Sequence, residues 1–212
     1  MHLLTEGVQS ANLAVHNRNL EQRADMGTTM TAALVVAPLG KIYAEDDTRS
    51  PMATAYIANV GDSRTYLYRK ARGLTKLTND HSVVASLVEA GIIRPDDIYT
   101  HPKRNQIYRS LGEKPVVEVD SFVVPLDLDD KLLLCSDGLW DMVRDPKIED
   151  VLKSYEPDPN MTGDMLIQAA LDGGGEDNVS VIVVHIPDLS RQNAQLGIQL
   201  IDKPDPVQLP PL

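Results

Sequence analysis

Two acidic turns, each at the end of an apolar run, are the strongest constraint on how this chain can fold. The apolar run 131–135 leads directly into a turn that carries Asp137, and Asp177 directly precedes a second apolar run, 179–184. One carboxylate therefore ends a predicted strand and the other begins one. If these strands are antiparallel neighbours, both Asp side chains project from the same edge of the sheet, where oxygen ligands suit a hard cation. The sequence therefore predicts a divalent metal site at this edge.

The overall charge restricts the classes of partner. The 212 residues include 20 Lys and Arg against 31 Asp and Glu, so the net charge is −11. Phosphate backbones and anionic membranes are bound by clustered basic side chains, so we expect neither nucleic acid nor a membrane as a partner. A chain this acidic would need a metal ion to offset the repulsion of any phosphate that it handles. The length is sufficient for one globular domain with a large core.

Cysteine usage and hydropathy indicate the compartment. Cys135 is the only cysteine and lies inside an apolar run, which makes it a buried core thiol rather than half of an internal disulfide. No charged and apolar leader opens the sequence, and no apolar run approaches the roughly 20 residues that a membrane span requires. We therefore expect a soluble protein in the cytoplasm.

Periodicity and turn residues predict a mixed fold in which strands and helices do not alternate regularly. The expected strands are 27–36, 52–60, 64–69, 74–77, 116–124, 131–135 and 179–186. The expected helices include 6–25, a helix that ends near 89, one that ends near 154, and 161–171. This order favours an α+β fold, an antiparallel sandwich with flanking helices.

Two polar positions have ordinary structural interpretations. Asp62 lies between two predicted strands in the run Gly-Asp-Ser, which predicts a tight hairpin whose Asp stabilises its own turn. Asp80 is placed to act as the N-cap of the following helix. His81, beside this cap, is then expected to be structural rather than catalytic.

The segment 82–112 is predicted to be a helical insertion between sheet strands. It is locally basic, with Arg94, Lys103, Arg104 and Arg109. These side chains could form an ordinary solvated face or a cationic flap over an anionic substrate. Beyond 187 the sequence is rich in proline and loses periodicity, so 188–212 is expected to be a tail or linker.

Five ordered motifs resemble those of the metal-dependent protein phosphatase family, type 2C, and most closely its bacterial branch. They are Met26-Gly-Thr-Thr29, Asn59-Val-Gly-Asp-Ser-Arg64, Leu77-Thr-Asn-Asp-His81, Leu134-Cys-Ser-Asp-Gly-Leu-Trp-Asp141 and Gly175-Glu-Asp-Asn-Val179. The resemblance covers roughly residues 7–187. It places one phosphatase-like domain at 1–187, with the flap at 82–112 and the tail after it.

The resemblance implies a four-layer α-β-β-α sandwich with a metal cluster at one end. In that family two Mn²⁺ or Mg²⁺ ions, with a third and weaker site, hold a water that attacks the phosphorus of phosphoserine or phosphothreonine. No side chain then serves as the nucleophile. The chemistry is reasonable, because two cations roughly 4 Å apart can activate the nucleophile and neutralise the phosphoryl oxygens.

Motif positions assign the site residues. Asp137 and Asp177 match the ligands of the metal cluster, and Ser136, Gly138 and Asn178 match the residues that shape the loops around them. Judged alone, Asp-Gly and Asp-Asn are ordinary turn sequences.

The third and weaker metal site has two candidate ligands. Asp62 matches its ligand in the family, although its turn explains it equally well. Asp141 could join that site, because it lies four residues after Asp137 and would share its helix face.

One part of the family pattern is absent. The opening segment of the family carries an Asp-Gly pair that bridges both metals, a His proposed as general acid and an Arg that binds phosphate. His2, His16 and Arg18 do not match those motifs. Two early strands are also expected to be missing, which would leave a sheet edge unpaired and favour dimerisation or strand exchange. An incomplete coding sequence, completion by another chain and loss of catalysis remain alternative explanations.

Three functions follow as hypotheses. The first is a Mn²⁺- or Mg²⁺-dependent protein serine/threonine phosphatase that acts on phosphorylated proteins and opposes a serine/threonine kinase. The second is a catalytically incomplete binding or regulatory module that keeps the fold. The third is a metal phosphatase for small phosphorylated molecules. The first is the leading hypothesis, and the absent bridging Asp and general acid are the feature that supports the second.

Overall fold

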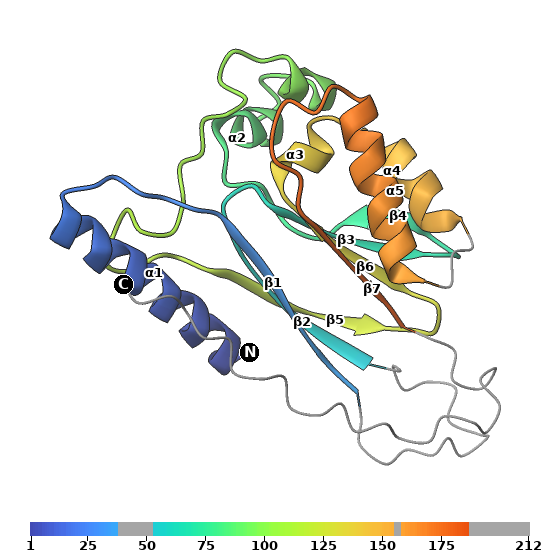
Figure 1. Cartoon of the computed structure of the whole chain (residues 1–212), viewed down its shortest axis with the longest axis horizontal. Helices are drawn as coiled ribbons and strands as arrows, with labels where there is room; N and C mark the ends of the chain where they lie inside the picture. The colour runs from blue at the N-terminus through green and yellow to red at the C-terminus, as the bar shows by residue number, and fades with distance from the viewer. Residues whose placement is uncertain (38–52, 155–157, 187–212) are drawn as a thin grey trace.

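Two antiparallel sheets form the centre of the protein (Figure 1). A computed structural model describes residues 1–37, 53–154 and 158–186. Its helices are α1 (His2–Gln22), α2 (Val83–Glu89), the short 3₁₀ helix η1 (Pro95–Tyr99), α3 (Asp137–Trp140), α4 (Asp145–Lys153) and α5 (Pro159–Asp172). Its strands are β1 (Met30–Val36), β2 (Ala53–Val60), β3 (Arg64–Arg69), β4 (Gly73–Lys76), β5 (Asp120–Leu126), β6 (Lys131–Cys135) and β7 (Val181–His185).

The elements form four layers. The first sheet has the strand order β1-β2-β5 and the second has the order β4-β3-β6-β7. Helix α1 lies on the outer side of the first sheet, and α4 and α5 lie on the outer side of the second (Figure 1). This arrangement confirms the expected α+β sandwich with the layer order α-β-β-α.

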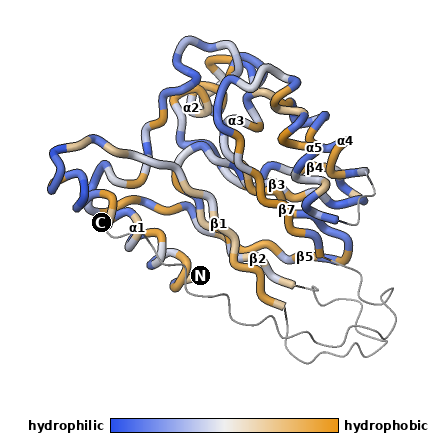
Figure 2. The backbone as a smooth tube through the Cα atoms, viewed as in Figure 1, coloured by the Kyte–Doolittle hydropathy of each residue, from blue (hydrophilic) through white to orange (hydrophobic). Residues whose placement is uncertain are grey.

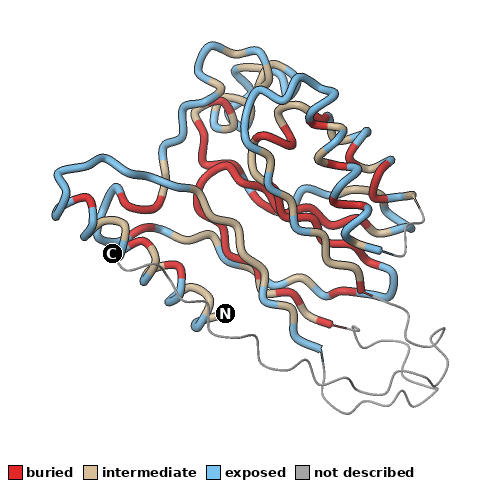
Figure 3. Tube along the Cα trace, viewed as in Figure 1, coloured by how far each residue is buried: buried red, intermediate tan, exposed pale blue. Residues whose placement is uncertain are grey.

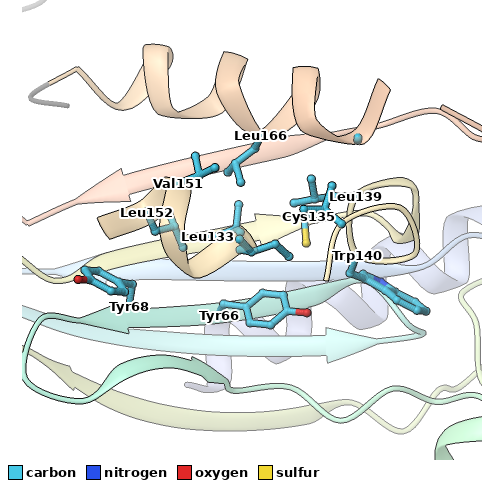
Figure 4. Close-up of a cluster of buried hydrophobic side chains, with 12 residues drawn as sticks. Tyr66, Tyr68, Leu133, Cys135, Leu139, Trp140, Val151, Leu152 and Leu166 are labelled. Atoms are coloured by element: carbon cyan, nitrogen blue, oxygen red, sulfur yellow. The ribbon is translucent and has the colours of Figure 1, made fainter. Parts of the chain in front are cut away.

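Each interface between layers has its own apolar cluster. Between the sheets, Ile57 and Leu126 of the first sheet are buried with Leu132 and Leu134 of the second. Leu133 and Cys135, the alternate residues of β6, instead face the helices (Figure 4). Because side chains alternate along a strand, β6 must be apolar on both faces, which explains its uninterrupted apolar run. The expected burial of Cys135 is confirmed, since this residue is 4% exposed.

Helix α1 is attached differently from the other layers. Within α1 only Val8 and two polar residues, Asn12 and Asn19, are buried, and most of the helix is exposed (Figure 3). The Asn12 amide donates to the Lys114 carbonyl, and its oxygen accepts from the Gly112 N–H at 2.9 Å. Figure 2 shows the same contrast, with mixed hydropathy along α1 and mainly apolar strands. Side-chain to backbone hydrogen bonds therefore fix much of this layer.

The predicted hairpin at 61–63 is wrong. Strand β2 pairs with β1 and β5, whereas β3 pairs with β4 and β6, so the turn carries the chain from one sheet to the other. The sequence suggested a hairpin because a Gly-Asp-Ser turn between two strands has the same local chemistry in either case. What differs is the set of pairing partners, because β2 is the central strand of the first sheet and β3 lies between β4 and β6 in the second.

The predicted N-cap at Asp80 is also wrong. Helix α2 begins after Ser82, whose hydroxyl accepts from the Ala85 N–H at 3.2 Å. Asp80 instead forms a buried ion pair with Arg64 at 2.7 Å. Both residues are competent caps, and the buried Arg64 guanidinium decides between them because it requires a carboxylate partner.

Some expectations concern other parts of the chain. The tail at 188–212 and the first residue of the strand predicted at 52–60 lie outside the described residues. Within the described part, no helix combines the length and the apolar character that a membrane crossing requires.

The core between the second sheet and the helices should dominate stability. Leu133→Ala removes a side chain that is 0% exposed in this cluster, so we expect a loss of about 2–5 kcal/mol in the free energy of unfolding. Leu20→Ala removes the same atoms from a position in α1 that is 67% exposed, and we expect a change below about 0.5 kcal/mol. Urea denaturation of both variants measures the difference, and similar losses would contradict this assignment of the core.

Candidate metal centre

The pairing of β6 with β7 joins the two acidic turns. The strands are antiparallel neighbours, with Cys135 opposite Val181, which is the condition that the predicted site required. Beyond this pair the Ser136 N–H donates to the Ser180 carbonyl at 3.0 Å, and the Ser136 hydroxyl accepts from the Ser180 N–H at 3.0 Å. The same hydroxyl contacts the Asn178 carbonyl at 3.3 Å. Ser136 therefore links both turns at the sheet edge.

A glycine allows the two turns to approach each other. A Cβ atom at Gly138 would overlap the backbone carbonyl of Asn178. Only a residue without a side chain fits there, so the turns can lie in direct contact. This contact gives a physical reason for Gly138 at a position that the sequence identified by motif alone.

Backbone groups orient the two carboxylates. Asp137 is the first residue of α3, and its Oδ1 accepts from the Gly138 N–H at 3.0 Å. Asp177 Oδ1 accepts from the Asn178 N–H at 2.6 Å. Asp141 follows α3, and its N–H donates to the Asp137 carbonyl at 2.9 Å. The expected helical relation of Asp137 and Asp141 is thus present.

The acidic side chains line one small pocket. Its volume is about 250 Å³, and it is lined by Asp137, Asp141, Asp177, Glu176, Arg104, Asn105, Gly138 and Met142. Burial raises the pKa of Asp137, and the neighbouring carboxylate of Asp177 raises it further. Crowded carboxylates with raised pKa values are the environment that a divalent cation relieves.

Asp62 belongs to the same electrostatic group. Burial raises the pKa of its carboxyl to about 6, and the second cause is the charge of Asp137. The four acidic residues predicted from the sequence are therefore electrostatically linked, with Asp62 coupled to Asp137 and Asp137 coupled to Asp177 and Asp141.

The turn that carries Asp62 packs closely against Thr29 and is hydrogen-bonded to His81 and Trp140. Gly61 has a φ of +101°, and a Cβ there would overlap Thr29. The Gly61 N–H donates to His81 Nδ1 at 3.0 Å, so His81 has the structural role that the sequence predicted. The Trp140 indole N–H donates to the Asp62 carbonyl at 3.0 Å. These contacts fix the backbone of a residue that is only 7% exposed.

One of the four basic residues in 82–112 reaches the acidic pocket. Arg104 contacts Glu176 at 3.2 Å and Asp141 at 3.8 Å. Arg109 instead pairs with Asp120 at 2.8 Å and with Glu118. Sequence reasoning treated the four residues as a group and did not single out Glu176. The sequence feature that could have identified Glu176 is its position next to Asp177 in the same turn.

The donors fit a hard cation but form a partial set. Within the described ranges 1–37, 53–154 and 158–186, no group of three or more His, Cys, Asp or Glu side chains is arranged to hold a metal ion. Mg²⁺ is commonly bound by one or two carboxylates and keeps several water ligands, so Asp137 and Asp177 are suitable donors for a site that is largely hydrated.

Substitution of Gly138 tests the close approach of the turns. In Gly138→Ala the new methyl group must displace the Asn178 carbonyl and separate Asp137 from Asp177, so we expect Mn²⁺ affinity to fall about tenfold, which corresponds to about 1.4 kcal/mol. Gly7→Ala is the matched control, because a Cβ at Gly7 meets nothing within 4 Å. Titration calorimetry measures both affinities, and equal values would contradict the proposed geometry.

The raised pKa of Asp62 predicts a pH effect on stability. The folded protein keeps this proton up to about pH 6, whereas the unfolded chain releases it near its ordinary value of 3.8. Between these values the folded state binds more protons, so the free energy of unfolding should fall as pH rises through this window. Thermal unfolding in chelator should show the decline, and Asp62→Asn should flatten it. A decline of the same size in Asp62→Asn would assign the effect to other groups.

Comparisons with known proteins identify the family. Residues 2–89 match the family model described as Protein phosphatase 2C. A curated relative, "Serine/threonine phosphatase stp" of Listeria welshimeri, is 42% identical over 159 residues, which cover 75% of this chain and 56% of that protein. The chain thus spans a little more than half the length of this relative.

Solved structures agree with the sequence match. A bacterial serine phosphatase has a TM-score of 0.74 and 35% identity over 87% of this chain and 69% of that one. The catalytic domain of the serine/threonine phosphatase PstP, solved with two manganese ions, has a TM-score of 0.71 and 33% identity over 87% of this chain and 70% of that one. By fold, by motif and by these similarities, the chain belongs to the protein phosphatase 2C family.

Proposed function

We propose that this chain is a Mn²⁺- or Mg²⁺-dependent protein serine/threonine phosphatase. The observation that carries the proposal is the pairing of β6 with β7, which places Asp137 and Asp177 in one pocket together with Arg104. The relatives named as serine/threonine phosphatases support the same activity, although this chain spans only part of their length.

Each site residue has a distinct role in this proposal. Asp137 and Asp177 would hold the principal cation, and Asp62 and Asp141 would serve the weaker site beside them. Ser136, Gly138 and Asn178 keep the two turns together. When bound, a divalent cation would supply Lewis-acid chemistry and offset the charge on the phosphoryl oxygens.

Arg104 is suited to recognise the substrate phosphate. Its guanidinium lies at the rim of the acidic pocket, where it contacts Glu176 and Asp141. A planar guanidinium can donate two parallel hydrogen bonds to phosphate oxygens. A phosphate dianion entering the pocket would compete with the two carboxylates for Arg104, so this residue would orient the substrate from the flap side.

The biological setting follows from the activity. The substrates would be phosphorylated proteins, and a serine/threonine kinase would oppose the enzyme. Nucleic acid does not fit a net charge of −11. Location in the cytoplasm, dimerisation through a sheet edge and the boundary between the domain and a tail at 188 remain predictions.

A second candidate is a phosphatase-like binding or regulatory module that does not turn over. The partial donor set among the described residues favours this alternative. Such a module would keep the fold and at most one metal ion, without turnover. A third candidate, a phosphatase for small molecules, would prefer nucleotides or sugar phosphates to phosphopeptides in a substrate panel.

Hydrolysis of para-nitrophenyl phosphate tests the main proposal. We expect activity that requires Mn²⁺ and that falls more than about 100-fold in Asp177→Ala, because loss of an outer-sphere partner alone costs up to that factor. Asp164→Ala is the matched control, since Asp164 is an exposed residue of α5, and it should keep full activity.

Circular dichroism should accompany each activity measurement. Folded protein without Mn²⁺-dependent activity would favour the binding module. Activity that persists in Asp177→Ala would show that the acidic pocket is not the site of reaction.

A further inference from the structure

The flap, residues 82–112, is only partly packed against the rest of the protein. Its two ends are held at the base, where Ser82 bridges to Ile107 within the flap and Leu111 bridges to Thr28. Under the flap lies a cavity of about 880 Å³, whose lining includes Arg64, Tyr99 and Arg144. A segment that spans a cavity depends on a few contacts for its position.

Tyr99, the last residue of η1, makes one of these contacts. Its ring lies 6.4 Å from the Trp140 ring, at an interplanar angle of 60°. The Arg144 guanidinium carbon is 3.2 Å from the centre of the Tyr99 ring. The Tyr99 carbonyl accepts from Arg104 at 3.3 Å. Tyr99 therefore contacts Trp140 through its ring and Arg104, at the acidic pocket, through its carbonyl.

Trp140 connects Tyr99 to two of the acidic residues, Asp62 and Asp137. It ends α3, the short helix that begins at Asp137, and it is 5% exposed. Its indole N–H donates to the Asp62 carbonyl at 3.0 Å. The Arg64 guanidinium carbon lies 3.6 Å from the centre of the Trp140 ring. A shift of Trp140 must therefore disturb the turn at Asp62 or the start of α3.

Arg64, the charged neighbour of Trp140, is held by a buried ion pair and hydrogen bonds. Arg64 donates to both carboxylate oxygens of Asp80 and to the Tyr66 hydroxyl at 2.9 Å. Tyr66 in turn donates to Asp145 at 3.1 Å. Figure 4 shows Tyr66 and Trp140 within the buried cluster that also includes Leu139. Tyr99 is thus the aromatic partner of Trp140 that belongs to the flap.

We propose that Tyr99 is a positioning residue that couples the flap to the turn carrying Asp62 and to α3, with Trp140 as the intermediate group. While Tyr99 packs on Trp140, the Asp62 carbonyl and Asp137 stay in place and Arg104 stays at the acidic pocket. The link to metal binding rests on the proposed function. Because coupling between two sites is reciprocal, metal binding at the turns would also stabilise the packed flap.

Hydrogen exchange tests the coupling without any metal. In Tyr99→Ala we expect amides at 61–64 and 137–143 to exchange about tenfold faster, since these segments lose the contact that immobilises Trp140. Tyr99→Phe keeps the ring and should restore wild-type exchange. Ile92→Ala is the control within the flap, because Ile92 is 68% exposed and should leave these amides unchanged. Unchanged exchange at both segments in Tyr99→Ala would refute the proposal.

Fluorescence then tests the link to the metal. Trp140 is the only tryptophan in the sequence, so emission excited selectively at the long-wavelength edge of the indole absorption reports on this group and not on the tyrosines. In a Mn²⁺ titration we expect Tyr99→Ala to bind 5- to 150-fold more weakly than wild type, the usual range for coupled sites, and Tyr99→Phe to match wild type.

The two experiments separate the possible failures. Wild-type Mn²⁺ affinity in Tyr99→Ala would overturn the coupling while leaving the proposed function intact. Calorimetric absence of Mn²⁺ binding in every variant, together with faster exchange in Tyr99→Ala, would refute metal dependence and support the coupling.

Discussion

The pairing of β6 with β7 is the interaction on which the site depends. It places the end of one buried strand beside the start of another, so two residues 40 positions apart in the sequence, Asp137 and Asp177, face one pocket. Ser136 bonds across the ends of the strands, and Gly138 allows the backbones to touch. The hydrophobic burial of β6 on both faces holds this geometry, because the pair cannot move without exposing apolar side chains to water.

Electrostatic cost accompanies this arrangement. Burial and repulsion from neighbouring carboxylates raise the pKa values of Asp62 and Asp137, and a bound cation would relieve these unfavourable interactions. Buried carboxylates that repel one another stay close only where other interactions of the fold hold them in place. Here the opposing forces are the sheet pairing and the backbone hydrogen bonds that orient each carboxylate.

A second buried network connects the site to the flap. Arg64 binds Asp80, stacks on Trp140 and bonds Tyr66 within a few ångströms. Because an unpaired charge in this position would cost several kcal/mol, about 3–5 for loss of one partner, each member restricts the others. Trp140 is therefore the shared neighbour of the turn at Asp62, of Arg64 and of Tyr99 on the flap.

The sequence by itself determined the local elements and the chemistry of the turns. Apolar runs with acidic ends predicted β6, β7 and a site at their common edge, because side-chain alternation and turn chemistry are local properties. The five ordered motifs extended this interpretation to the family. Only the tertiary structure decided which partners meet: the turn at 61–63 crosses between sheets, Asp80 serves Arg64 instead of α2, and Arg104 alone of the four basic flap residues reaches the acidic pocket. These choices depend on burial and on contacts between distant segments, and local propensity contains no information about either.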